Sequence, residues 1–254
     1  MFRTLCCAAA LLACSAALAQ TDPKDDIKAA VQKVTTADNY TWSSSMDGGR
    51  FSGTSDGKIQ GGLVHVTSSF GDNTMEFYAK GDQAAIKTDD GWKSASEILA
   101  DADNNGGGGG GGGGFDPNVM AARMATAYKA PADQSLALVD QLQNIQKTAD
   151  GYTADLTEDG VKQMMTFGRR RRNNANGNGP QFSNLKGNVV LTIADGALTK
   201  SVVHVTGTMS FNGNDVDVDR TTTVTFSNVG STSIDVPADA AAKLSGATSQ
   251  PAAQ

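Results

Sequence analysis

The sequence predicts a mainly β protein of the α+β class, in which helices cover one face of a large antiparallel sheet. Runs with hydrophobic residues at every second position recur in both halves of the chain, and residues that favour tight turns separate them. Segments with hydrophobic residues three and four positions apart lie before, between and after these runs. Because a sheet with an apolar face must bury it, these helices are its expected cover.

The first residues predict export. Residues 1–19 contain Arg3, an apolar run and then Ala17-Leu18-Ala19, which is the layout of a secretory signal peptide with Gln20 as the mature N-terminus. A second interpretation treats Leu11-Leu12-Ala13-Cys14 as a lipoprotein cleavage box that leaves Cys14 lipidated. We therefore expect a periplasmic or cell-envelope protein, either free or lipid-anchored at Cys14.

Composition narrows the classes of partner. The formal net charge is −6, so we expect no nucleic-acid partner. If residues 1–19 are removed, no cysteine remains, which excludes disulfides and cysteine-based metal sites. No later stretch reaches the roughly 18 apolar residues of a membrane-spanning helix. We expect a monomer without cofactor or metal.

The N-terminal half begins with a helix and continues as a meander of strands. Ile27, Ala30, Val31 and Val34 have helical spacing after an acidic first turn, and this helix should pack on the sheet. From Tyr40 the period is two, and three groups each share a strand face: Tyr40, Trp42 and Met46; Val64, Val66 and Phe70; Met75, Phe77 and Ala79. Turns are expected at Asp47-Gly48-Gly49, Asp56-Gly57, Gly71-Asp72-Asn73, Gly81-Asp82 and Asp90-Gly91.

The middle of the chain predicts helices and two inserts. A short helix capped by Ser94 and ending at Leu99 precedes a flexible insert at 101–115 that contains nine consecutive glycines. Helices should then begin at Asp116-Pro117 and at Pro131, the second carrying Leu136, Val139 and Leu142. A strand pair around Ile145 and Tyr152 to Leu156 precedes a helix capped by Thr157, and a second flexible insert spans 168–184.

The C-terminal half returns to strands at Leu185. Three groups share faces there: Val189, Leu191 and Ile193; Val203, Val205, Met209 and Phe211; Val216, Val218, Val224 and Phe226. Turns are expected at Asp195-Gly196 and Asn212-Gly213. Closing strands should run to Val236, and Pro237 should end them and begin a short helix to Leu244. Residues 20–244 are thus expected to form one domain, with a disordered tail at 245–254.

The C-terminal sequence resembles the end of proteins in the LolA/LppX superfamily of periplasmic lipoprotein carriers and lipid-binding lipoproteins. The residues concerned include TVTFS from Thr223 to Ser227, then Ile234, and Val236-Pro237 before the short helix. FYAKGDQAAIKTDDGWKS from Phe77 and ADLTEDGVKQMM from Ala154 are similar to earlier segments of these proteins. The resemblance covers most of residues 25–244. It implies a large curved antiparallel sheet, an unclosed β-barrel, with helices covering the concave face and an apolar cavity that holds acyl chains.

The expected ligand-binding residues are the apolar side chains of that cavity and a separate basic run. Methionine is common on adaptable apolar surfaces, and hydrophobic spacing alone does not distinguish a cavity lining from a filled core. The expected lining is Trp42, Phe77, Met120, Met124, Tyr128, Leu136, Val139, Val224 and Phe226. Arg169, Arg170, Arg171 and Arg172 are candidates for contact with anionic lipid headgroups, or form a solvated loop.

One motif suggests hydrolase chemistry. Gly53-Thr54-Ser55-Asp56-Gly57 matches the G-x-S-x-G nucleophile elbow, which requires a strand, a strained turn and a helix. Lys58 onward has strand character instead, which favours a hairpin turn. His65 and His204 are each flanked by valines, so both should point to the outer face of the sheet.

Two acidic motifs suggest calcium, and both have simpler explanations. Asp101 to Gly106 copies the start of an EF-hand loop, but Gly112 stands where a bidentate glutamate is required. Asp215, Asp217 and Asp219 form an acidic stripe on one strand face, which favours a solvated outer surface.

Three functions remain, the first of which we favour: an exported protein that binds or carries a lipid or a lipoprotein acyl chain. The second is a structural or interaction protein of the cell envelope with a filled core. The third is a hydrolase that uses Ser55.

Overall fold

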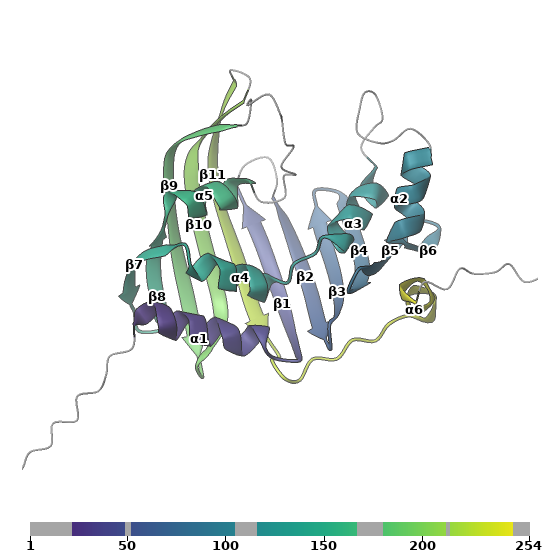
Figure 1. Ribbon diagram of the computed structural model, residues 1–254, viewed down its shortest axis with the longest axis horizontal. Coiled ribbons are helices and arrows are strands. Elements are labelled where there is room, and N and C mark those ends of the chain that lie inside the picture. Colours follow the sequence, from purple (N-terminus) through teal and green to yellow (C-terminus); the bar gives the residue numbers. More distant parts are fainter. Residues whose placement is uncertain (1–21, 49–51, 105–115, 167–179, 212–213, 246–254) are drawn as a thin grey trace, which may run out of the picture.

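The computed structural model describes residues 22–48, 52–104, 116–166, 180–211 and 214–245. Its strands form one antiparallel sheet in the order β6-β5-β4-β3-β2-β1-β11-β10-β9-β8-β7, which curves around a layer of helices and does not close (Figure 1). Two consecutive meanders therefore meet where β1 pairs with β11, with Trp42 opposite Phe226. The fold class predicted from the sequence is confirmed.

The first meander forms half of the sheet. Its strands are β1 (Asn39–Asp47), β2 (Gly53–Gln60), β3 (Leu63–Phe70), β4 (Asn73–Lys80), β5 (Gln83–Thr88) and β6 (Gly91–Ser94). Gly71 and Gly81 adopt positive φ in two of the expected turns. The turn expected at Asp56-Gly57 is wrong, because both residues lie inside β2, and the chain turns instead at Gly61 and Gly62, with φ of 55° and 77°.

The second meander forms the other half. Its strands are β7 (Leu142–Lys147), β8 (Gly151–Leu156), β9 (Gln181–Ala194), β10 (Ala197–Phe211) and β11 (Asn214–Ser227). β9 begins at Gln181, four residues before the sheet was expected to resume, since Gln181 to Ser183 already pair with β10. The rest of the insert expected at 168–184 lies largely outside the described residues, as does the Asn212-Gly213 turn.

Five helices lie on the concave face, with their apolar residues against the sheet (Figure 1). Ile27, Val31 and Val34 of the first helix are buried as expected, because their spacing places them on one side. Asp116 caps the third helix by accepting from the backbone of Asn118 and Val119, as its position before Pro117 predicts. The helices are α1 (Pro23–Thr35), α2 (Ala95–Asn104), α3 (Pro117–Thr126), α4 (Pro131–Val139) and α5 (Glu158–Thr166).

Two helix ends differ from expectation. α2 continues to Asn104, so residues 101–104, expected in a flexible insert, are helical. α4 ends at Val139, and Leu142 begins β7 instead of belonging to the helix. At α4 the hydrophobic spacing continues past the end of the helix into β7, whereas Asp101 to Asn104 carry no hydrophobic spacing that would have extended α2.

The C-terminal segment packs on the convex face. β11 ends at Ser227, so the strand expected to run to Val236 is wrong. The following segment leads to α6 (Ala238–Leu244), where Ala240 packs against Tyr78 and Ala85. This small second core covers the outer side of β4 and β5.

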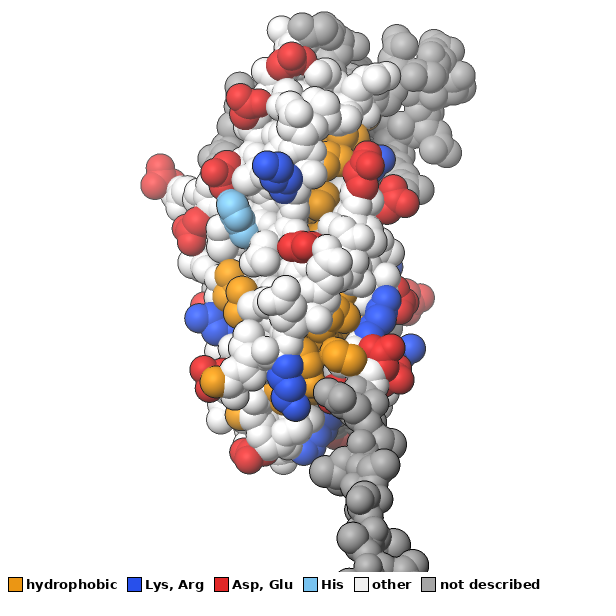
Figure 2. Space-filling view, turned by 90° about the vertical axis from the view of Figure 1, so that its left-hand side faces the viewer, with side chains coloured by type: hydrophobic (Ala, Val, Ile, Leu, Met, Phe, Trp, Pro, Cys, Tyr) orange, Lys and Arg blue, Asp and Glu red, His pale blue; other side chains and the backbone are white. Residues whose placement is uncertain are grey.

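The side of the molecule that carries β7, β8 and β9 is shown in Figure 2, where acidic and basic side chains are interspersed. Within the described residues, no helix is long and apolar enough to cross a membrane.

Candidate functional site

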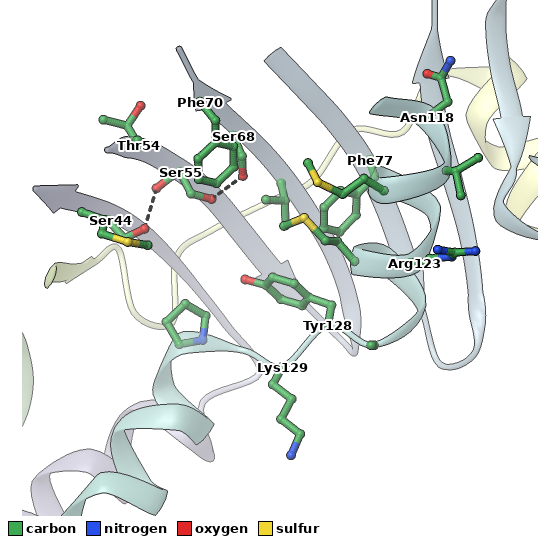
Figure 3. A pocket seen from close by; sticks show the side chains of 18 of the residues that line it. Ser44, Thr54, Ser55, Ser68, Phe70, Phe77, Asn118, Arg123, Tyr128 and Lys129 are labelled. Carbon is green, nitrogen blue, oxygen red and sulfur yellow. Dashed lines mark hydrogen bonds between the residues drawn. The ribbon is translucent and has the colours of Figure 1, made fainter. Parts of the chain in front are cut away.

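A pocket of about 1050 Å³ lies between the concave face of the sheet and the helices (Figure 3). One wall is the sheet, mainly β1, β2, β3 and β11 with Phe77 of β4. The other is formed by the helices, mainly α2, α3 and the α3–α4 connection, with Met164 of α5. Its larger hydrophobic lining residues are Trp42, Met46, Val66, Phe70, Phe77, Ile98, Val119, Met120, Met124, Tyr128, Met164 and Val224. This volume is slightly above the roughly 300–1,000 Å³ typical of small-molecule sites.

Two glycines shape the floor of this pocket. A Cβ atom on Gly57 would stand 2.0 Å from the Trp42 ring, and one on Gly53 would stand 2.5 Å from the Phe70 ring. Trp42 belongs to β1 and Phe70 to β3, so the two rings extend over β2 from opposite sides. The glycines of the G-x-S-x-G motif thus provide space for aromatic rings.

Ser55 lies between these glycines and joins a row of serines. The Ser68 hydroxyl donates to the Ser55 hydroxyl oxygen at 2.8 Å, and the Ser44 hydroxyl donates to the Ser55 carbonyl oxygen at 3.3 Å (Figure 3). Ser68 is only 3% exposed although it is polar. The pocket wall is therefore apolar with a narrow polar band.

Tyr128 projects into the pocket from the α3–α4 connection (Figure 3). Its ring centroid is 6.1 Å from that of Trp42 and 5.6 Å from that of Phe77, the latter pair edge to face. Burial raises the pKa of the Tyr128 phenol above its ordinary range, so the side chain stays neutral. Tyr128 also lines a second, smaller pocket of about 450 Å³ with Tyr40 and Asp133, and so borders both spaces.

Charged residues line the pocket from the helices and from β11. Arg123 comes from α3 and Asp101 from α2. The Arg220 guanidinium, on β11, donates to the Met164 carbonyl oxygen near the end of α5. Lys129 also borders the pocket, but its side chain points away from the serine row in Figure 3.

Six of the nine expected lining residues border the pocket: Trp42, Phe77, Met120, Met124, Tyr128 and Val224. The other three do not. Val139 is 2% exposed and belongs to the core, Leu136 packs against that core, and Phe226 contacts Tyr40 at 5.9 Å between ring centroids. Their apolar spacing indicated burial, which is common to a pocket wall and a filled core. Arg169 to Arg172 and Cys14 lie outside the described residues.

The sequence did not indicate the serine row as part of the site. Ser44 and Ser68 lie in strands whose apolar neighbours dominated the pattern, although a serine between hydrophobic residues on an inward face was a usable signal. The G-x-S-x-G motif indicated Ser55 as a candidate hydrolase nucleophile and not as part of a ligand-binding wall.

The geometry does not bring either histidine to Ser55. His65 and His204 lie on the convex face, where each Nε2 pairs with a carboxylate, Glu76 at 2.9 Å and Asp219 at 2.8 Å. Ser55 faces the concave side within β2, without the strained turn that a nucleophile elbow requires.

The acidic motifs take structural roles. Asp101 and Asp103 lie on α2 and not in a loop. Asp217 and Asp215 accept hydrogen bonds from Thr208 and Ser210 on the exposed face of β10 and β11, as expected of a solvated stripe. Among the described residues, no group of three or more His, Cys, Asp or Glu side chains is arranged to hold a metal ion.

No family model and no curated protein matches the chain. Among solved structures, Mycobacterium tuberculosis lipoprotein LppX is similar over 85% of this chain and 98% of its own, with 10% identity and a TM-score of 0.45. LprF from Mycobacterium bovis is similar over 86% of this chain and 97% of its own, with 12% identity and a TM-score of 0.42. A DUF1329 family protein from Desulfovibrio piger has 9% identity and a TM-score of 0.24, over 82% of this chain and 92% of its own. At these identities and TM-scores the similarities concern the arrangement of strands and helices alone.

Proposed function

We propose that this protein binds or carries a hydrophobic ligand, a lipid or the acyl chain of a lipoprotein, in the pocket between sheet and helices. The observation that supports this most is the pocket itself, about 1050 Å³ with Trp42, Phe77 and Met124 on its walls. A filled core, as the structural alternative requires, has few voids larger than a water molecule. A ligand with an apolar body gains roughly 25 cal/mol for each Å² of hydrocarbon removed from water.

The two tryptophans allow binding to be located. Trp42 lines the pocket, whereas Trp92 packs with the second core on the convex side, near Tyr78 at 5.3 Å between ring centroids. Because the chain has two tryptophans, Trp92→Phe leaves Trp42 as the only reporter, and Trp42→Phe leaves Trp92.

The experiment titrates each variant with a brominated fatty acyl ester, which quenches tryptophan fluorescence on contact. Binding in the pocket quenches the Trp92→Phe protein, saturates, and leaves the Trp42→Phe protein bright. Circular dichroism confirms that both variants are folded. Absence of quenching in both, or equal quenching in both, contradicts the proposal.

We also propose that the protein acts in the cell envelope, as an exported chain that is either free or lipid-anchored. The apolar run within residues 1–19 and Cys14 support this. Intact mass of protein from its own host separates the two forms: a chain starting at Gln20 indicates the free form, and a chain starting at a diacylated Cys14 indicates the anchored form. A mature chain that keeps Met1 contradicts both.

A further inference from the structure

A band of three serines crosses the pocket wall between two apolar rows. Ser44, Ser55 and Ser68 are directly opposite one another on three neighbouring strands. On one side the adjacent row is Trp42, Gly57 and Val66, and on the other it is Met46, Gly53 and Phe70. Successive rows on one sheet face are about 7 Å apart, so the hydroxyls lie between hydrophobic surfaces.

Ser55 is the acceptor in both hydrogen bonds within the band. Its hydroxyl oxygen accepts from Ser68, and its carbonyl oxygen accepts from Ser44. A serine hydroxyl carries one donor hydrogen as well as its acceptor lone pairs. Within the described part of the chain, the Ser55 hydroxyl hydrogen has no acceptor, and the residue lines the pocket. The band thus presents a hydrogen-bond donor to the pocket.

The surroundings specify what that donor is suited to bind. Burial of a hydroxyl without a partner is unfavourable, so an acceptor on a ligand stabilises the bound state. The rows beside the band contain no ionised side chain, and Arg123, Asp101 and Arg220 reach the pocket from the helices and from β11. At the band itself a neutral acceptor such as a carbonyl is therefore better suited than a carboxylate. Apolar rows on both sides require hydrocarbon on both sides of that acceptor.

We propose that the serine band binds the ester carbonyl of a neutral lipid, with Ser55 as the donor and with the two hydrocarbon arms along the Trp42 row and the Phe70 row. The inference rests on the proposed function, because it assigns the ligand class of the same pocket. Ser55 is then a specificity-determining residue and performs no covalent chemistry.

The test uses two ligands that differ in the carbonyl. Decyl decanoate and didecyl sulfide have closely matched hydrocarbon arms, but the ester offers a carbonyl oxygen and the sulfide only a weakly accepting sulfur. Each is titrated against protein loaded with the fluorescent apolar probe N-phenylnaphthylamine. The wild-type protein should bind the ester roughly three- to tenfold more tightly than Ser55→Ala does, the range expected for one added hydrogen bond, with no comparable difference for the sulfide.

The test variant is Ser55→Ala, which removes the proposed donor. Ser201→Ala is the matched control, because Ser201 lies in the same row on β10 and is 3% exposed but does not line the pocket. Ser55→Ala should lose this ester-specific gain, and Ser201→Ala should bind the ester as tightly as the wild-type protein.

The outcomes separate this inference from the proposed function. If Ser55→Ala leaves ester binding unchanged, or if it weakens both ligands equally, the ester assignment is wrong while the binding function stands. If neither ligand displaces the probe, both the ester assignment and the proposed function are wrong.

Discussion

The indole ring of Trp42 lies over Gly57 on the neighbouring strand, where a Cβ atom would stand 2.0 Å from the ring. Trp42 and Gly57 are directly opposite in the β1–β2 register. The missing side chain on β2 therefore allows the ring to lie across the sheet, 6.1 Å between centroids from Tyr128 on the opposite wall of the pocket. This contact joins the sheet to the α3–α4 connection.

Gly57→Ala should destabilise the protein by about 1–3 kcal/mol, the usual range for overpacking a filled site. Urea denaturation measures the free energy of unfolding. A double-mutant cycle supplies the control: in a Trp42→Leu background the added methyl group has space, so the cost of Gly57→Ala should fall. Equal costs in both backgrounds would show that the ring is not the cause.

Thr222→Phe should weaken binding of an apolar probe by about tenfold or more, equivalent to at least about 1.4 kcal/mol. Thr222 lines the pocket from β11, so the added ring occupies ligand space. Thr223→Phe is the matched control, because the next residue of a strand points to the opposite face. Fluorescence titration measures the affinity of both variants for the probe. Equal loss of affinity in the two variants would argue against this pocket as the binding site.

Tyr128→Ala should increase the acyl chain length that binds most tightly. Tyr128 lines both pockets, of about 1050 Å³ and about 450 Å³, and removal of its ring connects them. A series of fatty acyl esters of increasing length, compared by probe displacement, measures the preference. Tyr128→Phe keeps the ring and should keep the wild-type optimum. The same optimum in the Ala and Phe variants would mean that Tyr128 does not limit chain length.

Glu97 joins α2, on the concave face, to α6, on the convex face. Its carboxylate accepts a hydrogen bond from the Ser94 backbone N–H at 2.8 Å and one from Lys243 Nζ at 2.9 Å. Both bonds lower the pKa of the Glu97 carboxyl, and the bond from Ser94 has the larger effect. A lowered pKa in the folded state contributes stability above the ordinary glutamate value of 4.5, which is lost as pH falls through the folded value.

Glu97→Gln should therefore cost roughly 0.2–1 kcal/mol at pH 7, as for a partly exposed ion pair, and less with each step toward acid. Glutamine can still accept from Ser94, so the variant isolates the charge. Urea denaturation at several pH values measures the difference from wild type. Lys243→Met should cost a similar amount at pH 7, and little more when combined with Glu97→Gln. A cost that stays constant below pH 4 would contradict the assignment.

Local turn chemistry predicted most of the meander but failed at Asp56-Gly57. The same dipeptide type does turn at Asp90-Gly91, where Gly91 has a φ of 111°. At Gly57 the glycine is required by a ring from another strand, and a neighbour fifteen positions away is invisible to a local pattern. The local pattern therefore predicted a turn at Asp56-Gly57, where the structure has the part of β2 that forms the pocket floor.

The candidate site was predictable in part. Met120, Met124 and Tyr128 have helical spacing, which correctly placed them on the face toward the sheet. Leu136 and Val139 share that property but pack against other side chains. The spacing of hydrophobic residues indicates which face of a helix or strand a side chain lies on. It does not indicate whether that face borders a pocket or packs against other side chains.

The sequence by itself determined the strand faces, the capped start at Asp116 and the outward orientation of His65 and His204, because these follow from the geometry of a few consecutive residues. The tertiary structure alone decided that β1 pairs with β11, that Trp42 crosses Gly57, and that a pocket remains above the serine band. Each of these depends on residues far apart in the chain, whose separation is set only when the sheet curves and the helices pack against it.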